Sequence, residues 1–318
     1  MAKAALVVGG SGYLGQHLTR ALIGGGWRVS VTYRSNEDAA RAARAAGAAA
    51  VRCDVATDEG ASAAAAEAER VGAAVVINCA ALSQPRKCQE DPQAARAANS
   101  PARLLRALAA VEGATPVFVH ISTDQVYKGD RAVWAVGDAT EPVNAYGETK
   151  LAAEDDVREA APPGGAVVLR SSIIYGPEAP LASVGRPLFV QFVEGALRKG
   201  EPTSFFDDEW RCPVYVGDFA RAIEAIAGAR GVARGGFEVY NFGGPERLSR
   251  VDMARAVARA CALSEAAIVE ASAATVDRGV ASPPDISMDS RPTEEALGFS
   301  MARFEDALRQ HVFVGGGA

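Results

Sequence analysis

The chain has 318 residues, of which 49% are hydrophobic and 23% are charged, so it is long enough to bury a large core and too apolar to be disordered as a whole. A spanning helix needs about 20 consecutive apolar residues. The sequence has no such run, so we expect no membrane anchor. The formal net charge of −6 argues against a surface that binds nucleic acid, although one local pocket for a phosphate stays compatible with it.

Cysteine and histidine are few and scattered. The chain has five cysteines and three histidines and no C-x-x-C pair, so we expect a reducing compartment and no metal site. The first residues show neither a signal peptide nor a transit segment. We therefore expect a cytoplasmic protein, with import after removal of an organelle peptide left open.

Short apolar runs alternate with amphipathic stretches along the first half of the chain, which is typical of buried strands separated by helices. The predicted strands are residues 4–8, 28–33, 49–53, 74–78, 117–121 and 167–170. This alternation predicts an α/β fold with a doubly wound parallel sheet of about seven strands, a Rossmann fold. The alanine-rich stretches 39–50 and 61–70 are predicted to be exposed helices that pack closely on that sheet.

Three glycines follow the first predicted strand directly. Gly9, Gly12 and Gly15 form a G-x-x-G-x-x-G pattern, and the next helix opens at Tyr13 and Leu14. Glycines at this junction allow a tight turn and a close approach of the backbone to a pyrophosphate, while the helix N-terminus presents free N–H groups to it. These residues are therefore predicted to bind a dinucleotide cofactor.

The end of the second predicted strand indicates which dinucleotide binds. An NAD-selective site usually offers an acidic residue there to the adenosine ribose, but this chain has Arg34 and Ser35. A guanidinium and a hydroxyl can bind a 2′-phosphate through charge-assisted hydrogen bonds, so NADP(H) is favoured over NAD(H). An ordinary surface role for Arg34 stays open.

Residues after the third and fourth predicted strands complete the adenosine site. Asp54, followed by Val55, stands where a carboxylate can meet the adenine amino group. Cys79, Ala80 and Ala81 have small side chains, which leave room for the adenosine ribose. All of these residues are predicted to contact the cofactor.

Residues suited to proton transfer follow the fifth predicted strand. Thr123 lies near the end of that strand, and Tyr146 and Lys150 share one face of the helix that comes next. A phenol with a pKa of about 10 is a slow acid or base at neutral pH, and an adjacent ammonium favours the phenolate. We predict that Tyr146 transfers a proton, that Lys150 assists it and that Thr123 holds the substrate oxygen.

Prolines and glycines interrupt the pattern after residue 170, which is typical of a loop-rich lobe that covers a site. Beyond it we expect a strand at 237–241 and helices at about 188–199, 217–229, 248–261 and 301–313, with Ser249 opening the third helix. The predicted NADP-binding domain comprises residues 1–170 with 212–245, and the predicted substrate-binding lobe comprises residues 171–211 with 246–318.

Three segments carry a family resemblance that covers essentially the whole chain. They are residues 122–127 (STDQVY), 146–150 (YGETK) and 169–176 (LRSSIIYG). With the glycine turn, they resemble the extended short-chain dehydrogenase/reductase superfamily, and within it dTDP-4-dehydrorhamnose reductases and the regulatory β subunit of methionine adenosyltransferase. Residues 207–216 and 282–289 are most similar to a land-plant and algal branch of that group.

The resemblance implies roles for particular residues. Thr123, Tyr146 and Lys150 take the positions of the catalytic triad, and Lys150 also contacts the nicotinamide ribose. Asn99 and Ile173 are implied to lie in the cofactor site.

The substrate residues depart from the patterns of related enzymes. Asp124 and Gln125 are implied to face the substrate, but 4,6-dehydratases carry an Asp-Glu pair there, and an amide cannot shuttle a proton, so dehydration is disfavoured. Residues 211–214 (RCPV) stand where rhamnose reductases usually have Gly-x-Pro-Thr, so their substrate specificity cannot simply be transferred. Arg211 is predicted to bind a substrate phosphate, with pairing to the acidic residues 207–209 left open.

These observations favour an NADPH-dependent reductase of a keto-sugar nucleotide or a similar polar carbonyl compound. Two alternatives stay open: a sugar-nucleotide epimerase, and an NADP(H)-binding regulatory subunit of the methionine adenosyltransferase β type. The expected partner is a small-molecule substrate, and a homodimer or a partner enzyme stays open.

Overall fold

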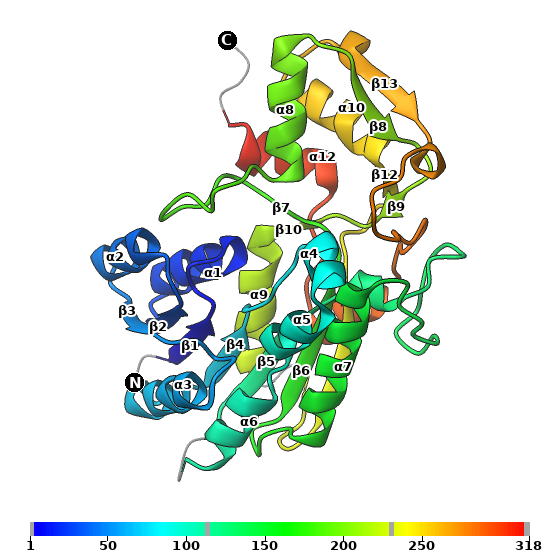
Figure 1. Cartoon of the computed structure of the whole chain (residues 1–318). Coiled ribbons are helices and arrows are strands. Elements are labelled where there is room, and N and C mark those ends of the chain that lie inside the picture. Colours follow the sequence, from blue (N-terminus) through cyan, green and yellow to red (C-terminus); the bar gives the residue numbers. More distant parts are fainter. Residues whose placement is uncertain (1–2, 112–114, 229–231, 315–318) are drawn as a thin grey trace.

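The computed structural model describes residues 3–111, 115–228 and 232–314 of the chain. Its centre is a seven-stranded sheet in which every neighbouring pair is parallel (Figure 1). In spatial order the strands are β11 (Phe237–Phe242), β6 (Ala166–Ser171), β5 (Val117–Thr123), β4 (Val75–Asn78), β1 (Ala4–Val8), β2 (Arg28–Tyr33) and β3 (Ala49–Arg52). The chain reverses its direction across the sheet between β1 and β4, so the predicted doubly wound parallel sheet is confirmed.

Strand β1 shows why the strands are continuous apolar runs. Ala5 and Val7 belong to the core on one face of the sheet, and Leu6 and Val8 belong to the core on the other face. All four side chains are inaccessible to solvent. A parallel strand covered on both faces has no solvent side for polar residues, which is why helices must lie on both faces.

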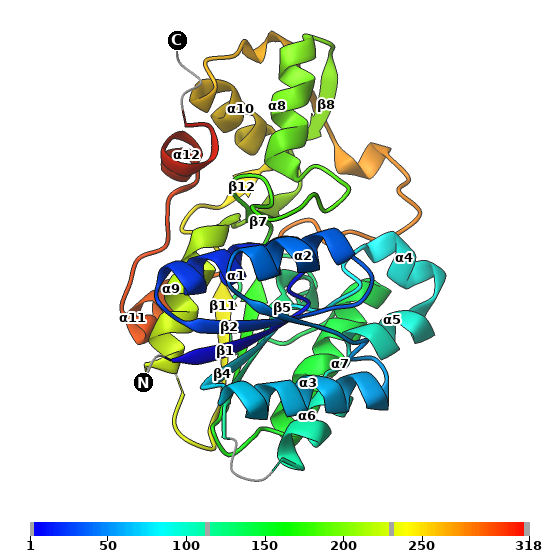
Figure 2. The ribbon, with the colours of Figure 1, turned by 90° about the vertical axis from the view of Figure 1, so that its left-hand side faces the viewer.

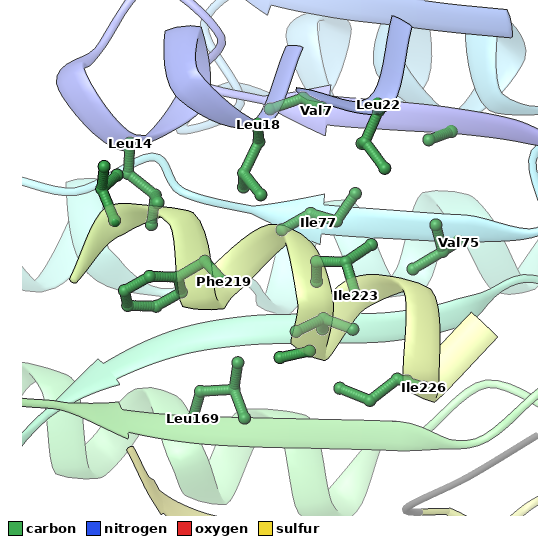
Figure 3. Packing of buried hydrophobic residues seen from close by; sticks show 14 of the residues in the cluster. Val7, Leu14, Leu18, Leu22, Val75, Ile77, Leu169, Phe219, Ile223 and Ile226 are labelled. Atoms are coloured by element: carbon green, nitrogen blue, oxygen red, sulfur yellow. The ribbon is translucent and has the colours of Figure 1, made fainter. Parts of the chain in front are cut away.

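One face of the sheet is covered by α1 (Tyr13–Gly24), α2 (Glu37–Ala45) and α9 (Val216–Ala227) (Figure 2). Figure 3 shows Phe219, Ile223 and Ile226 of α9 packed between α1 and the sheet residues Ile77 and Leu169. This contact brings a late segment of the chain onto the glycine-turn helix, and it therefore joins the two halves of the sheet.

The opposite face is covered by α3 (Asp58–Val71), α6 (Ala102–Ala109) and α7 (Ala145–Glu159), while α4 (Pro85–Glu90) and α5 (Pro92–Asn99) pack against α7. The alanine-rich helices are half-buried, which corrects the prediction that they are exposed. Helix α2 also ends at Ala45, because the predicted helical residues 49–50 belong to β3. Small side chains such as Ala43 and Ala64 are buried and let the helices approach the sheet closely.

A smaller lobe stands over the carboxyl ends of the strands (Figure 1). It contains α8 (Phe189–Lys199), α10 (Arg250–Ala260), α12 (Phe304–Ala307) and a parallel pair of strands, β8 (Thr203–Phe206) and β13 (Ile268–Ala271). Two further short pairs lie between this lobe and the sheet: β7 (Ile174–Tyr175) with β10 (Val214–Tyr215), and β9 (Trp210–Arg211) with β12 (Leu248–Ser249).

The second half of the chain follows the predicted pattern in part. Ser249 caps α10 in a capping box with Asp252, as its position predicted. The helix predicted at 217–229 is α9, and Ala229 lies outside the described residues. The helix predicted at 301–313 is shorter, because α12 gives way to one π turn at Leu308–Val312.

Helix α11 (Arg291–Leu297) has no counterpart in the sequence pattern. It packs on α9 and β11 beside the sheet, although the predicted division assigns its residues to the substrate-binding lobe. The division into two domains stays a prediction.

Candidate functional site

A cavity of about 830 Å³ lies between the lobes at the carboxyl ends of the strands. The carboxyl edge of a doubly wound sheet is where such folds bind ligands, because strand ends and helix N-termini converge there. The residues from the sheet side that line the cavity are Gly12, Tyr13, Leu14, Gly15, Cys79, Ala81, Thr123, Asp124, Gln125, Tyr146 and Ile173. The small lobe and its connections contribute Arg186, Arg211, Arg250 and Arg278. The structure thus brings most of the predicted site residues to one place.

The glycine turn fits the pyrophosphate of a dinucleotide. Gly9 has a φ of 78°, which favours glycine, and a Cβ on Gly15 would lie 2.4 Å from the Gly9 carbonyl oxygen. Helix α1 begins at Tyr13, and its N-cap residue, Gly12, has no side chain that could cap the helix. The N–H groups of its first turn are therefore available to a bound anion. Ala80 packs against Gly9, where a Cβ would lie 2.8 Å from the Ala80 nitrogen.

The predicted 2′-phosphate reader lies at the open edge of the sheet. The Arg34 side chain is 73% exposed, and its Nη1 lies 3.8 Å from Asp54 Oδ2, so two predicted cofactor residues form a loose ion pair. Ser35 is exposed beside it, and Val55 is half-buried. Arg52 at the end of β3 donates from Nε to the Arg34 carbonyl oxygen (3.3 Å), which places a second guanidinium near this edge. The signal for Arg52 was its position at a strand end, which sequence reasoning did not use.

The proton-transfer residues meet where β5 ends and α7 begins. Asn144 caps α7 by accepting a hydrogen bond from the Gly147 N–H (2.9 Å), and this cap sets the direction in which Tyr146 and Lys150 leave the helix. Thr123 and Tyr146 both line the cavity. Burial raises the pKa of Tyr146, and a hydrogen bond with Thr123 opposes that rise. Thr123 is thus placed to orient the phenol through this hydrogen bond.

Lys150 is almost completely buried one helical turn below Tyr146. Burial lowers the pKa of its ammonium to about 8, and the carboxylate of Glu154 opposes that effect. Glu154 in turn forms a buried ion pair with Arg170 (2.8 Å) and accepts a hydrogen bond from Ser122 (2.5 Å). The charge of Lys150 is therefore set by protein groups and not by bulk water.

The sequence analysis assigned no role to one residue beside Lys150. His120 lies with Nε2 2.9 Å from Lys150 Nζ and Nδ1 3.2 Å from Asn78 Nδ2, and its ring is inaccessible to solvent. Burial, assisted by the Lys150 charge, holds the pKa of His120 well below its usual range, so the ring is neutral. The only sequence signal was a histidine inside an apolar strand.

Asn99 has its side chain committed to the protein. Its Oδ1 accepts from the Leu82 N–H (2.7 Å), and its Nδ2 donates to the Leu82 carbonyl (3.3 Å) and to Thr149 Oγ1 (2.9 Å). Asn99 therefore ties the chain after β4 to α7, and its predicted contact with the cofactor stays a prediction. Burial raises the pKa of Cys79 to about 12, which keeps this cavity-lining residue a thiol.

Asp124 lines the cavity, and its carboxyl group is buried. Thr123 Oγ1 donates to its Oδ1 (3.2 Å), while Oδ2 has no hydrogen-bond partner among the described residues. Burial raises the pKa of Asp124, and the Arg211 charge opposes that rise. Gln125 accepts a hydrogen bond from Asn144 Nδ2 (2.9 Å) and so braces the start of α7.

Arg211 is buried and makes four hydrogen bonds. Its guanidinium donates to the carbonyl oxygens of Trp210 (2.8 Å), Pro283 (2.9 Å) and Pro284 (3.2 Å) and to the hydroxyl of Ser282 (3.3 Å). These partners differ from the acidic residues 207–209 that the sequence left open. Arg211 thereby holds residues 282–284 at the cavity wall.

Arg250 and Arg278, which the sequence did not single out as site residues, are among the other arginines that line the cavity. Arg278 donates to Glu209 (2.6 Å), which is itself buried, and Arg250 lies 3.6 Å from the other oxygen of the same carboxylate. Burial lowers the pKa of Arg250 to about 10, and the neighbouring charge of Arg211 adds to that effect. The cavity wall is therefore positively charged opposite the proton-transfer residues.

A Rossmann sheet, a glycine turn that opens into a cavity, and a Tyr-x-x-x-Lys pair whose tyrosine lines that cavity define an extended short-chain dehydrogenase/reductase. Comparison with known proteins agrees with this class. The RmlD substrate binding domain family matches residues 3–313, and the chain belongs to that family. The resemblance drawn from the sequence is therefore confirmed.

Three relatives illustrate the range of the family. A probable low-salt glycan biosynthesis reductase from Haloferax volcanii is 31% identical over 237 residues, covering 74% of this chain and 75% of the relative. A dTDP-4-dehydrorhamnose reductase from Mycolicibacterium smegmatis is 37% identical over 188 residues, covering 57% and 52%. The methionine adenosyltransferase 2 subunit beta from Danio rerio is 27% identical over 242 residues, covering 75% and 72%.

Solved structures share the fold across nearly the whole chain. A dTDP-4-dehydrorhamnose reductase from Bacillus anthracis in complex with NADP has a TM-score of 0.79 at 19% identity and covers 98% of both chains. A UDP-glucose-4-epimerase from Stenotrophomonas maltophila with bound NAD has a TM-score of 0.81 at 19% identity, covering 98% of this chain and 97% of that one. Among the described residues no helix is long and apolar enough to cross a membrane, and no cluster of three potential metal ligands is present.

Proposed function

We propose that the protein is an NADPH-dependent reductase that acts on the keto group of a sugar nucleotide or a similar polar carbonyl compound. The observation that carries the proposal is that the glycine turn, Thr123 and Tyr146 all open into one cavity. The predicted class of activity agrees with the named relatives, several of which are reductases. The predicted cofactor agrees with NADP in the Bacillus anthracis reductase structure.

The cofactor would supply a hydride to the carbonyl carbon, and the protein's own residues would handle the proton. Tyr146 donates its phenolic proton to the carbonyl oxygen, which Thr123 and Tyr146 hold between them. Burial favours the neutral phenol in the absence of ligands, so the acid is ready when the substrate arrives. Lys150 then stabilises the phenolate that the transfer leaves behind, because its charge lies on the same helix face.

Other residues around the cavity would bind the cofactor and the substrate. The N–H groups of Tyr13, Leu14 and Gly15, at the start of α1, hold the pyrophosphate, and Arg34 with Ser35 binds the 2′-phosphate. The other cofactor contacts that we propose are those of Asp54, Val55, Cys79, Ala80, Ala81, Asn99 and Ile173. Asp124, Gln125 and Arg211 are proposed to contact or shape the substrate, and we expect Asp124 Oδ2 to accept a hydrogen bond from a substrate hydroxyl because it has no other partner.

An NADPH-oxidation screen over a panel of dTDP- and UDP-linked 4-keto sugars tests the proposal. Tyr146→Phe supplies the control, because it keeps the ring and removes the proton donor. We expect oxidation of NADPH with at least one keto sugar and none with the variant. No turnover by the wild-type protein on the whole panel, despite measured NADPH binding, would refute the reductase.

A regulatory role is the second candidate. The observation that favours it is the match to methionine adenosyltransferase 2 subunit beta over 75% of the chain. Co-purification with a methionine adenosyltransferase, together with the absence of turnover, would establish it. An epimerase ranks lower because Arg34 suits an exchangeable NADPH, whereas epimerases keep their cofactor, usually NAD. A homodimer and a cytoplasmic location stay predictions.

A further inference from the structure

His120 links Lys150, through Asn78, to the backbone of Ala80, where the cofactor is proposed to bind. The chain of contacts runs from Lys150 Nζ to His120 Nε2 (2.9 Å), from His120 Nδ1 to Asn78 Nδ2 (3.2 Å), and from Asn78 Oδ1 to the N–H of Ala80 (3.2 Å). Lys150, His120 and Asn78 are all buried. Water therefore cannot replace a missing hydrogen-bond partner in this series of contacts unless the surrounding side chains rearrange.

A neutral imidazole has one N–H and one lone pair, so its two neighbours must have opposite roles. The Ala80 N–H donates to Asn78 Oδ1, which leaves the Asn78 NH₂ group facing His120. If this amide donates to Nδ1, the ring proton is on Nε2 and points at Lys150. Only an uncharged amine can accept a hydrogen bond from that N–H, because an ammonium has no lone pair.

The opposite protonation state needs a different arrangement. When Lys150 is an ammonium it donates to Nε2 of His120, so the ring proton must be on Nδ1. Asn78 must then turn its oxygen toward the ring, and the Ala80 N–H loses its acceptor. This series of contacts thus has two consistent hydrogen-bonding states, and each corresponds to one protonation state of Lys150.

We propose that His120 is a positioning residue that couples the charge of Lys150 to the side-chain orientation of Asn78 and, through it, to whether the Ala80 N–H is free. This inference rests on the proposed function for the role of Lys150, and it adds a partner that selects the protonation state of that residue. The ammonium state would release the Ala80 N–H at the edge where the cofactor is proposed to bind. Binding of the cofactor and protonation of Lys150 would then favour each other.

The surroundings of Lys150 allow both states to be populated near neutral pH. The titratable and charged groups that face it are Glu154 on its own helix, paired with Arg170 of β6, and Cys79 after β4. Burial brings the pKa of Lys150 down to about 8, whereas the pKa of His120 lies far below that value. The proton that moves is therefore on Lys150, and the ring responds by changing its tautomer.

Ring-nitrogen NMR of the ¹⁵N-histidine-labelled protein without ligands tests the tautomer directly. The chain has only three histidines, so His17→Gln and His311→Gln assign two of them and leave His120 identified. From about pH 6.5 to about pH 9.5 we expect the His120 ring to stay neutral and to move its proton from Nδ1 to Nε2. Lys150→Met should abolish this change. A tautomer that is constant over the range, or an imidazolium at its lower end, would overturn the proposal.

NADPH affinity measured against pH tests the consequence for the cofactor. His120→Phe removes the partner of the buried ammonium, so the charged form of Lys150 becomes less favourable and its pKa falls. The weakening of NADPH binding with rising pH should then begin at least about one pH unit lower than in the wild type, a tenfold effect at a fixed pH. His120→Gln, whose amide can donate or accept, should restore the midpoint.

Two controls keep the interpretation clear. His311→Phe makes the same change in a ring that stacks on Tyr215, away from Lys150, and should leave the pH profile unchanged. If His120→Phe does not fold, the NMR measurement on the wild type still decides. Neither readout needs a substrate, so absence of reductase activity would overturn the proposed function while leaving this coupling intact. Equal midpoints in wild type and His120→Phe would refute the coupling.

Discussion

The open edge of the sheet and the segment between the lobes each contain an arginine for which the sequence predicted a ligand. The two side chains differ in their burial and in their partners. Arg34 is 73% exposed, and one ion pair of 3.8 Å joins it to Asp54. Arg211 is buried and donates to three carbonyl oxygens and one hydroxyl. The same side chain is therefore free to meet a ligand in the first region and committed to the fold in the second.

This difference teaches how function and stability are divided in the molecule. An exposed guanidinium can turn toward a phosphate with little loss of free energy, because its interactions with water and with a screened ion pair are weak. A buried guanidinium cannot leave without stranding the carbonyls that it satisfies. Changes at the sheet edge should therefore alter ligand binding or chemistry, and changes between the lobes should alter stability.

The largest expected effect belongs to Tyr146, which lines the cavity. Tyr146→Phe should reduce turnover by a factor of about 1,000 or more, since it removes the proton donor. The NADPH Kd should stay within a few-fold and Tm should hardly change, because the ring still fills its place. Steady-state kinetics, cofactor titration and thermal melting measure the three quantities, with Tyr215→Phe as a matched control. Retained turnover would show that another group donates the proton.

Arg211→Ala should destabilise the protein by about 3 kcal/mol, because it leaves several buried carbonyls without donors. The measurements are the denaturant midpoint and the NADPH Kd, which should change less than twofold. Arg291→Ala is the control, since that side chain is 80% exposed in an ion pair with Asp289 and does not line the cavity. An unchanged midpoint with a strongly raised KM would instead make Arg211 a substrate ligand and would break the comparison.

Arg34→Asp should weaken NADPH binding tenfold or more, about 1.4 kcal/mol, and affect NADH little. The reason is that only NADPH carries the phosphate that the guanidinium would bind. Arg41→Asp makes the same change on an exposed arginine of α2 and should leave both affinities unchanged. Equal losses for the two cofactors would show that Arg34 does not read the phosphate.

Arg52→Ala gives the smallest expected effect. Its side chain supports Arg34 through one hydrogen bond to the Arg34 carbonyl and adds a second positive charge at the edge. We expect the NADPH Kd to rise about threefold in low salt and less in high salt, since exposed charges are screened. A loss as large as that of Arg34→Asp would mean that Arg52 contacts the phosphate itself.

Much of the sheet, and of the site at the carboxyl ends of its strands, could be predicted, because the sequence signals there are local. Apolar runs between helical stretches predict the parallel strands, and Gly9, Gly12 and Gly15 occur directly after the first of them. The four-residue spacing of Tyr146 and Lys150 places them on one helix face before any tertiary contact is known. The strand ends bring these segments to the same edge because the sheet is parallel.

The roles of His120, Arg250 and Arg278 could not be predicted, because each depends on partners that are distant in the sequence. Lys150 is 30 residues from His120, and Asn78 is 42 residues from it. Arg278 meets Glu209 across 69 residues. A histidine in an apolar strand or an arginine at the start of a helix has no local pattern that reveals such a partner.

The sequence by itself determined the type of fold, the place of the glycine turn and the residues suited to proton transfer, since periodicity and spacing act over a few residues. The tertiary structure decided which charged side chains remain free. Burial and hydrogen bonding depend on what packs against a side chain, and they make Arg211 part of the fold while they leave Arg34 exposed. They also lower the pKa of Lys150 to about 8, because desolvation acts only once the chain has closed around the ammonium.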